Sequence, residues 1–75
     1  MIFYEMERIK LTINGADCSF EDPPSTVKAL LARLELAGVP VVVEHNREAL
    51  LPREHAVTAL ADGDTIEIVR VVAGG

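Results

Sequence analysis

A chain of 75 residues with 49% hydrophobic and 25% charged residues has the composition of one small globular domain. Twelve acidic and seven basic residues give a net charge of -5, which disfavours binding to nucleic acid because the phosphate backbone is also negative. We expect no membrane span or signal peptide, because the apolar runs are short and Glu5 and Glu7 interrupt the first of them. The single cysteine, Cys18, excludes an internal disulfide framework and fits a reducing compartment, so we expect a cytoplasmic protein.

The first predicted element is a β-hairpin. From residue 9 to 13 apolar and polar residues alternate, and the run leads into Asn14-Gly15, the dipeptide most typical of a two-residue hairpin turn. The return strand, residues 16–21, alternates again and places Cys18 on the same face as Phe20. We therefore assign Cys18 to packing and not to nucleophilic chemistry.

A single amphipathic helix is predicted after the two prolines at 23–24. Ser25 or Thr26 can cap it, because a side-chain oxygen accepts hydrogen bonds from the free N–H groups of the first turn. Gly38 is the predicted stop, and Pro40 prevents the helix from resuming. Four apolar residues recur with helical spacing and form one stripe: Val27, Leu30, Leu31 and Leu34.

The second half of the chain predicts further strands. Residues 41–43 are β-branched and indicate a buried strand, followed by a polar turn at 46–48 and a short second arm at 49–51. The sequence ADGD at 61–64 predicts a tight turn before the last strand, residues 65–72. We expect the helix stripe to face six apolar sheet residues: Ile9, Leu11, Ile13, Val42, Ile66 and Ile68.

These elements indicate an α+β fold, with the order β-β-α-β-β-β and a small mixed sheet covered on one face by the single helix. We expect residues 1–72 to form this domain, with residues 1–5 as a possible N-terminal extension. Residues 73–75 are expected to form a flexible tail, because glycines have no side chains to hold them.

The polar residues predict no catalytic or metal site. His45 and His55 match no metal-ligand spacing, and Asp62 and Asp64 flank the glycine of a turn, where aspartate is common for backbone reasons. No nucleotide-binding loop or catalytic triad order is present.

Four short motifs occur in a characteristic order toward the C-terminus: Asn46, Pro52-Arg53, Asp62-Gly63-Asp64 and Gly74-Gly75. In this order and spacing, the chain resembles the ThiS family of sulfur carriers in thiamine biosynthesis. The resemblance covers nearly the whole chain and implies a ubiquitin-like β-grasp fold.

The resemblance also implies a chemistry for the C-terminus. An E1-like adenylating enzyme of the ThiF type would use ATP and Mg to activate the carboxylate of Gly75, and a sulfur donor enzyme would convert it to a thiocarboxylate. A thiazole synthase of the ThiG type would then receive the sulfur. The resemblance thus implies that the chain itself is a carrier and not an enzyme, and that it binds no cofactor of its own. Ala73 and Gly74 would thread into the partner, since glycine lets the tail pass through a narrow channel.

The cost of ordering this tail must be met by contacts of the domain with its partner. The candidates for these contacts are Val69, Arg70, Val71, Val72 and Arg53. Each arginine is either a solvated charge or a partner contact through its planar guanidinium group.

Other functions stay open at this point. The small subunit of molybdopterin synthase shares the fold and the terminal glycines, but usually reaches them through a proline-containing segment that this chain lacks. A ubiquitin-like modifier or binding module would instead form an isopeptide bond with lysine. Conjugation and sulfur transfer both begin with adenylation, so the sequence separates them poorly.

Overall fold

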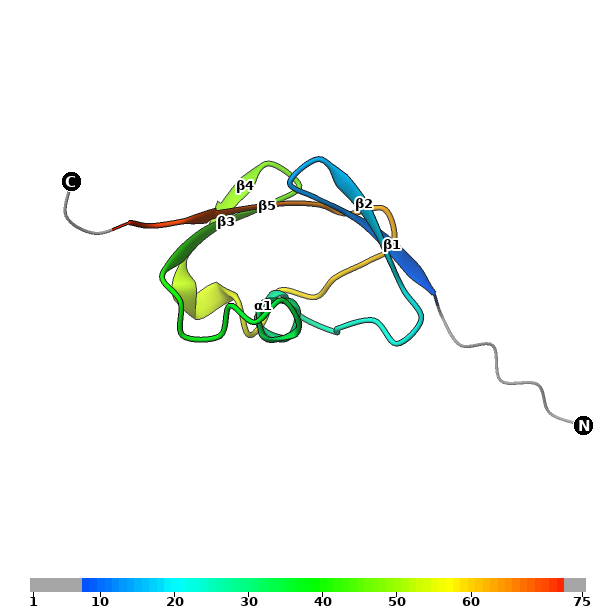
Figure 1. The fold of residues 1–75 in the computed structure, drawn as a ribbon, viewed down its shortest axis with the longest axis horizontal. Helices are drawn as coiled ribbons and strands as arrows, with labels where there is room; N and C mark the ends of the chain where they lie inside the picture. Colours follow the sequence, from blue (N-terminus) through cyan, green and yellow to red (C-terminus); the bar gives the residue numbers. More distant parts are fainter. Residues whose placement is uncertain (1–7, 73–75) are drawn as a thin grey trace, which may run out of the picture.

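The computed structural model describes residues 8–72 (Figure 1). The expectations for residues 1–5 and for the tail, Ala73, Gly74 and Gly75, lie outside the described residues. The elements in chain order are β1 (Ile9–Ile13), β2 (Ala16–Phe20), α1 (Val27–Arg33), β3 (Val41–His45), β4 (Glu48–Leu50), the 3-10 helix η1 (Pro52–Glu54) and β5 (Thr65–Arg70).

The five strands form one sheet in the order β2-β1-β5-β3-β4. β1 and β5 are parallel, whereas every other neighbouring pair is antiparallel. Helix α1 and η1 lie on the same side of this sheet (Figure 1). The α+β class, the mixed sheet and the single covering helix are therefore confirmed.

Both hairpins turn through two residues with positive φ. Asn14 has φ 49° and Gly15 has φ 81°, and Asn46 and Arg47 have φ 50° and 72°. Positive φ at both central residues is the geometry that matches the twist of the flanking strands. The predicted turn at Asn14-Gly15 is confirmed, and the second turn consists of Asn46 and Arg47 alone.

The core lies between α1 and the inner face of the sheet. Its buried residues are Ile9, Leu11, Ile13, Val27, Leu30, Leu31, Val43, Ile66 and Ile68. Cys18 and Phe20 pack against this cluster from β2, as expected for a packing cysteine.

The predicted phase of β3 is wrong by one residue. Val43 is fully buried, whereas Val42 is 47% exposed on the opposite face. Val43 pairs with the buried Ile68 on β5, and strand residues alternate between faces, so Val42 must point outward.

Helix α1 begins as predicted but ends early. The hydroxyl of Thr26 accepts a hydrogen bond of 3.1 Å from the backbone N–H of Ala29. The helix ends at Arg33, because Glu35 adopts φ 61° and the N–H of Leu36 donates to the C=O of Leu31 at 2.7 Å.

The predicted stop at Gly38 is therefore wrong. Gly38 has φ 76° and lies in the following turn, where the N–H of Val39 donates to the C=O of Leu36 at 3.0 Å. Leu34 comes after the last helical residue and is 37% exposed, so it does not complete the buried stripe.

The segment after β4, which the sequence left ambiguous, supplies hydrogen-bond acceptors for the first turn of α1. The free N–H groups of Val27 and Lys28 donate to the C=O groups of Thr58 and His55 at 3.0 and 2.8 Å. The carboxylate of Glu54 accepts the N–H of Leu51 at 2.8 Å. These contacts hold η1 beside the helix, as Figure 1 shows.

The pairing of β1 with β5 is short and ends at a side chain. The N–H of Thr12 donates to the C=O of Asp64 at 3.0 Å, and the N–H of Asn14 donates to the C=O of Ile66 at 2.9 Å. One step further along β5, the side-chain amide of Asn14 donates to the C=O of Ile68 at 3.1 Å and accepts its N–H at 2.7 Å. Asn14 thus extends the ladder to Ile68 after its own backbone has entered the turn.

Candidate partner-binding surface at the end of β5

β5 continues past the sheet as an exposed segment toward the C-terminus (Figure 1). After Arg70, the N–H of Val71 donates to the C=O of Pro40 at 3.0 Å, and this is the last backbone hydrogen bond along β5 in the described residues. Val72 is 86% exposed. The chain therefore presents the residues just before its tail to solvent.

The outward face of the sheet carries an apolar surface at this end. Ile66 and Ile68 point to the core, so the alternating residues Val69 and Val71 point away from the helix and are 60% and 52% exposed. Val42 of β3 lies directly opposite Val69. We call these three residues, Val42, Val69 and Val71, the valine patch.

The valine patch includes two predicted partner contacts and one residue that sequence reasoning missed. Val69 and Val71 were candidates from the alternation of the last strand. Val42 was assigned to the core, because a run of three valines contains no alternation from which its phase could be read. Exposed valines that lie beside one another on a sheet form a surface suited to a protein partner.

An acidic pair borders the valine patch. Glu44 and Glu67 are directly opposite each other on β3 and β5, and both are exposed. Within residues 8–72 neither forms a salt bridge. Like charges in this arrangement destabilise a sheet slightly and limit the apolar surface to the end near the tail.

The structure does not bring Arg53 onto this surface. Arg53 belongs to η1, on the helix side of the sheet, and lines a surface pocket of about 560 Å³ together with Leu31, Leu36, Pro40, Val41 and His55. Arg70 is exposed and makes no salt bridge within the described part of the chain. The predicted partner contacts are thus divided between two sides of the sheet.

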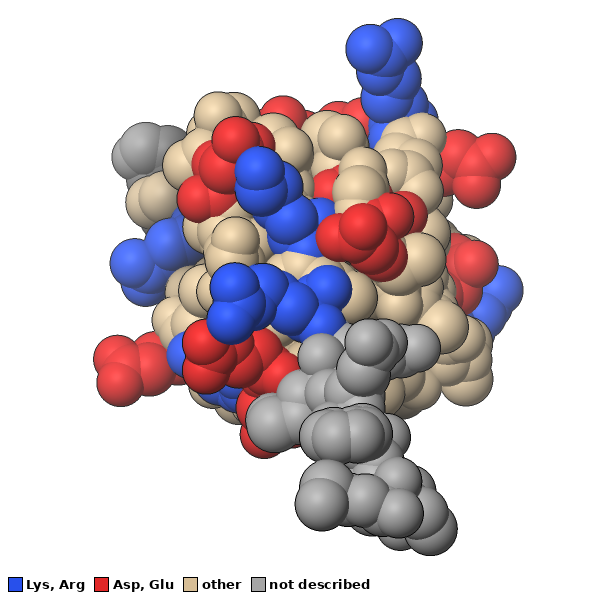
Figure 2. All heavy atoms as spheres, turned by 90° about the vertical axis from the view of Figure 1, so that its right-hand side faces the viewer, with Lys and Arg blue, Asp and Glu red and all other residues tan. Residues whose placement is uncertain are grey.

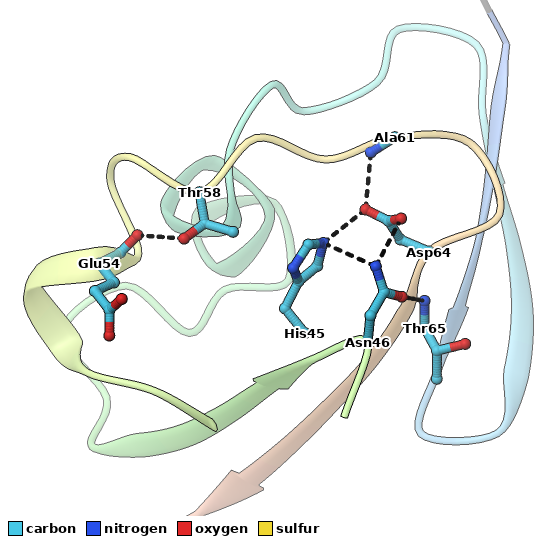
Figure 3. A network of polar contacts seen from close by, with 7 residues as sticks. All are labelled: His45, Asn46, Glu54, Thr58, Ala61, Asp64 and Thr65. Atoms are coloured by element: carbon cyan, nitrogen blue, oxygen red, sulfur yellow. Dashed lines mark hydrogen bonds and ion pairs between the residues drawn. The ribbon is translucent and has the colours of Figure 1, made fainter. Parts of the chain in front are cut away.

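A polar network joins the end of β3 to the start of β5, at the end of the sheet away from the valine patch (Figure 3). The carboxylate of Asp64 contacts Nε2 of His45 at 2.7 Å, accepts from the side-chain amide of Asn46 at 3.1 Å, and accepts the N–H of Ala61 at 2.9 Å. The amide oxygen of Asn46 also accepts the N–H of Thr65 at 2.8 Å. Two of the residues that carry the family resemblance, Asn46 and Asp64, are therefore in contact.

This network favours the ionised form of Asp64. Burial alone would raise the pKa of its carboxyl, but the hydrogen bonds from Asn46, His45 and the N–H of Ala61 outweigh this effect and leave the pKa lowered. Because a carboxylate can only accept, Nε2 of His45 carries the proton of their shared hydrogen bond. The geometry suits a structural clasp between two strands.

The remaining titratable groups form no catalytic arrangement in the described residues. Asp62 accepts the backbone N–H of Lys10 at 2.7 Å, and so it ties the turn to β1. His55 has a buried Nε2 without a hydrogen-bond partner in residues 8–72. No group of three His, Cys, Asp or Glu side chains within this range could hold a metal ion.

Figure 2 shows the end of the molecule opposite the valine patch, where β1 begins. Basic and acidic side chains alternate over this face without a large area of one sign. Across residues 8–72, no helix has the length and apolar character needed to cross a bilayer.

Comparison with known proteins identifies the family. The model of the ThiS family matches residues 11–75. The chain belongs to the ThiS family. The sulfur carrier protein ThiS of Bacillus subtilis is 37% identical over 65 residues, which cover 87% of this chain and 98% of that protein.

A solved structure agrees with this ThiS assignment. The crystal structure of the thiamine biosynthesis protein ThiS from Geobacter metallireducens is 33% identical, with a TM-score of 0.77, and the match covers 89% of this chain and all of that one. A thiazole synthase of Paramagnetospirillum magneticum is 40% identical over 67 residues, although these are 20% of its length. The ubiquitin-like β-grasp fold is thus confirmed.

Proposed function

We propose that this ThiS-family chain is a sulfur carrier whose terminal carboxylate, on Gly75, is adenylated by a partner and then converted to a thiocarboxylate. The thiocarboxylate donates its sulfur for the thiazole of thiamine. The observation that carries this proposal is the family match, which runs through the valine patch to the last glycine at residue 75. The carrier is a co-substrate of its enzymes and contributes no catalytic group.

The chemistry needs an unhindered acyl carbon. A carboxylate oxygen of Gly75 attacks the α-phosphorus of ATP, and pyrophosphate leaves. Sulfur at the oxidation level of sulfide then attacks the acyl carbon, and AMP leaves with the electron pair of the broken C–O bond. Glycine is suited to both steps because it has no Cβ to obstruct the attack.

The proposal requires three protein partners. The first is a ThiF-type adenylating enzyme, which binds the ATP and Mg. The second is a sulfur donor enzyme, and the third is a ThiG-type thiazole synthase. The similarity of this chain to part of a thiazole synthase supports the third. All of these proteins would act in the cytoplasm.

We assign docking of the adenylating enzyme to the valine patch. Burying these exposed valines is favourable, at roughly 25 cal/mol for each Å² of apolar surface. That contribution can offset the cost of ordering Ala73 and Gly74 in the partner, which is of order 1 kcal/mol per residue. Arg70 lies between Val69 and Val71 in the chain and Val72 follows them, so both would contact the same enzyme. Arg53 lies on the other side of the sheet and would contact a different part of a partner.

Intact mass spectrometry tests the proposal. The purified chain is incubated with ATP, Mg, the adenylating enzyme and a sulfur donor from the same organism. A carrier gains the mass difference between sulfur and oxygen, and it gains this mass only when ATP is present. A modifier would instead form an adduct with a lysine of another protein, with loss of water. An unchanged mass under all of these conditions would contradict the proposal.

A further inference from the structure

β5 has an edge that is only partly covered. On the side of β1, pairing stops at Ile13 with Ile66, and the side chain of Asn14 then satisfies Ile68. Beyond this point Gly15 turns the chain back into β2. No strand of the described domain lies beside the rest of β5 on this side.

The next backbone groups along that edge belong to Arg70 and Val72. The backbone N–H and C=O groups of successive strand residues point to opposite edges of the strand. The N–H of Val71 donates to the C=O of Pro40, on the side of β3, whereas the N–H of Ile68 donates to the side chain of Asn14, on the side of β1. The backbone N–H and C=O groups of Arg70 and Val72 therefore point to the side of β1, where residues 8–72 provide them with no backbone partner. We call Arg70 and Val72 the open edge.

We propose that the adenylating enzyme adds an extended segment of its own main chain to this open edge. The proposal rests on the proposed function and specifies how the same partner holds the tail. The segment would offer C=O groups to the N–H groups of Arg70 and Val72, and an N–H to the C=O of Arg70. Pairing of a partner strand with an unpaired edge is a general mode of protein recognition.

The position of the open edge favours this occupant. It adjoins the valine patch, so a partner that covers the patch already lies beside β5. Backbone pairing at Val72 fixes the direction of the chain three residues before Gly75. A misplacement of about 1 Å at a reacting centre can lower a rate on the order of a hundredfold, so a fixed direction has a direct use in adenylation.

The side-chain chemistry of the added segment follows from its neighbours. Strand residues that face the same side as the valine patch would be apolar, because they would lie next to Val69 and Val71. The β4 edge is a poorer site for such a segment, since β4 has three residues and lies on the far side of β3 from the tail.

Amide hydrogen exchange measured by NMR tests the pairing directly. The full chain is compared alone and with a saturating amount of the adenylating enzyme. We expect the amides of Arg70 and Val72 to exchange at least about tenfold more slowly in the complex, as hydrogen-bonded strand amides do. The amide of Thr12 is the internal reference, because it is already bonded to the C=O of Asp64 at the end of the sheet away from the valine patch. Unchanged exchange at Arg70 and Val72 in the saturated complex would overturn the proposal.

A pair of variants gives a second test. Val72→Pro removes both the side chain and the edge N–H, whereas Val72→Ala removes the side chain and keeps the N–H. We expect Val72→Pro to bind the enzyme roughly tenfold more weakly than Val72→Ala, which corresponds to the loss of one backbone hydrogen bond. Equal affinities would overturn the added strand.

The two proposals fail in different ways. If the unmodified chain is not adenylated, the carrier function fails, whatever the exchange rates are. If the unmodified chain is adenylated and Val72→Pro binds as well as Val72→Ala, the carrier function stands and the added strand fails.

Discussion

The side-chain amide of Asn14 forms two hydrogen bonds with the backbone of Ile68, a residue 54 positions later in the chain. The amide takes the place that a further residue of β1 would occupy. It can do so because Asn14 begins the hairpin turn with φ 49°, a conformation that asparagine tolerates better than most residues. One residue thus joins a local turn to the strand that leads to the tail.

We expect Asn14→Ala to destabilise the domain by about 1–3 kcal/mol, because the backbone groups of Ile68 lose their partners. Alanine is also strained at this positive φ. Asn14→Gly also lacks the two hydrogen bonds, but glycine is not strained at this φ. We therefore expect its stability to lie between that of Asn14→Ala and that of the parent chain. Urea denaturation measures both variants, and a glycine variant as stable as the parent would exclude a role for the hydrogen bonds.

Two leucines of the predicted helix stripe should behave differently. Leu30 is fully buried, and Leu30→Ala should cost about 2–5 kcal/mol through lost contacts and the cavity that remains. Leu34 lies beyond the helix and is 37% exposed, so Leu34→Ala should cost a small fraction of that. Thermal unfolding compares the two, and equal losses would contradict the observed end of α1.

The network around Asp64 predicts an acid-sensitive stability. The pKa of Asp64 is lowered in the folded chain, whereas the unfolded carboxyl has an ordinary pKa of about 3.9. The stabilisation is therefore fully present above about pH 4 and is lost as the pH falls through the lowered folded pKa. Free energies of unfolding from pH 7 down to acid measure this loss.

Asp64→Asn should remove most of this acid dependence, since it cannot ionise. Asp22→Asn makes the same change of charge at an exposed residue and serves as the control. The contribution of Asp64 is the difference between the two curves. Superimposable curves would show that the network does not hold an ionised carboxylate.

A charge in the valine patch should weaken association without unfolding the domain. Val69 is 60% exposed, so Val69→Asp leaves the core intact but places a carboxylate in an interface that excludes water. Ser19→Asp adds the same charge on the outward face at the distant strand β2 and is the matched control. Titration calorimetry with the adenylating enzyme should show a loss of at least about tenfold for Val69→Asp alone.

Removing Gly75 should separate chemistry from folding. The carboxylate is then displaced by about 3.3–3.6 Å, the length of one extended residue, and adenylation should fall on the order of a hundredfold or more. The circular dichroism spectrum should not change, because the core is formed by residues 9–68. Full adenylation of the shortened chain would contradict the proposed role of the terminal carboxylate.

The sequence predicted those parts of the fold that local patterns determine. The Asn14-Gly15 turn, the cap at Thr26 and the alternation around Ile66 and Ile68 are each encoded within a few residues. The early end of α1 was missed because Glu35, which is not a glycine, takes the left-handed conformation, and a glycine three residues later was the stronger local signal.

The parts that were not predicted depend on contacts between distant segments. The phase of β3 is set by its register with β5, which pairs Val43 with Ile68, and three consecutive valines carry no local sign of it. Asn46 and Asp64 were both noticed as motif residues, yet only the sheet topology brings them within 3.1 Å. The open edge at Arg70 likewise follows from the point where β1 stops.

The parallel pairing of β1 and β5 has a mechanical consequence. A force applied to the tail would act along the axis of β5, while the start of β1 lies at the opposite end of the molecule (Figure 1). Tension between these ends loads the hydrogen bonds beside β5 in shear, so that several must break together and none can be peeled off singly. The domain would therefore resist a force applied along its tail.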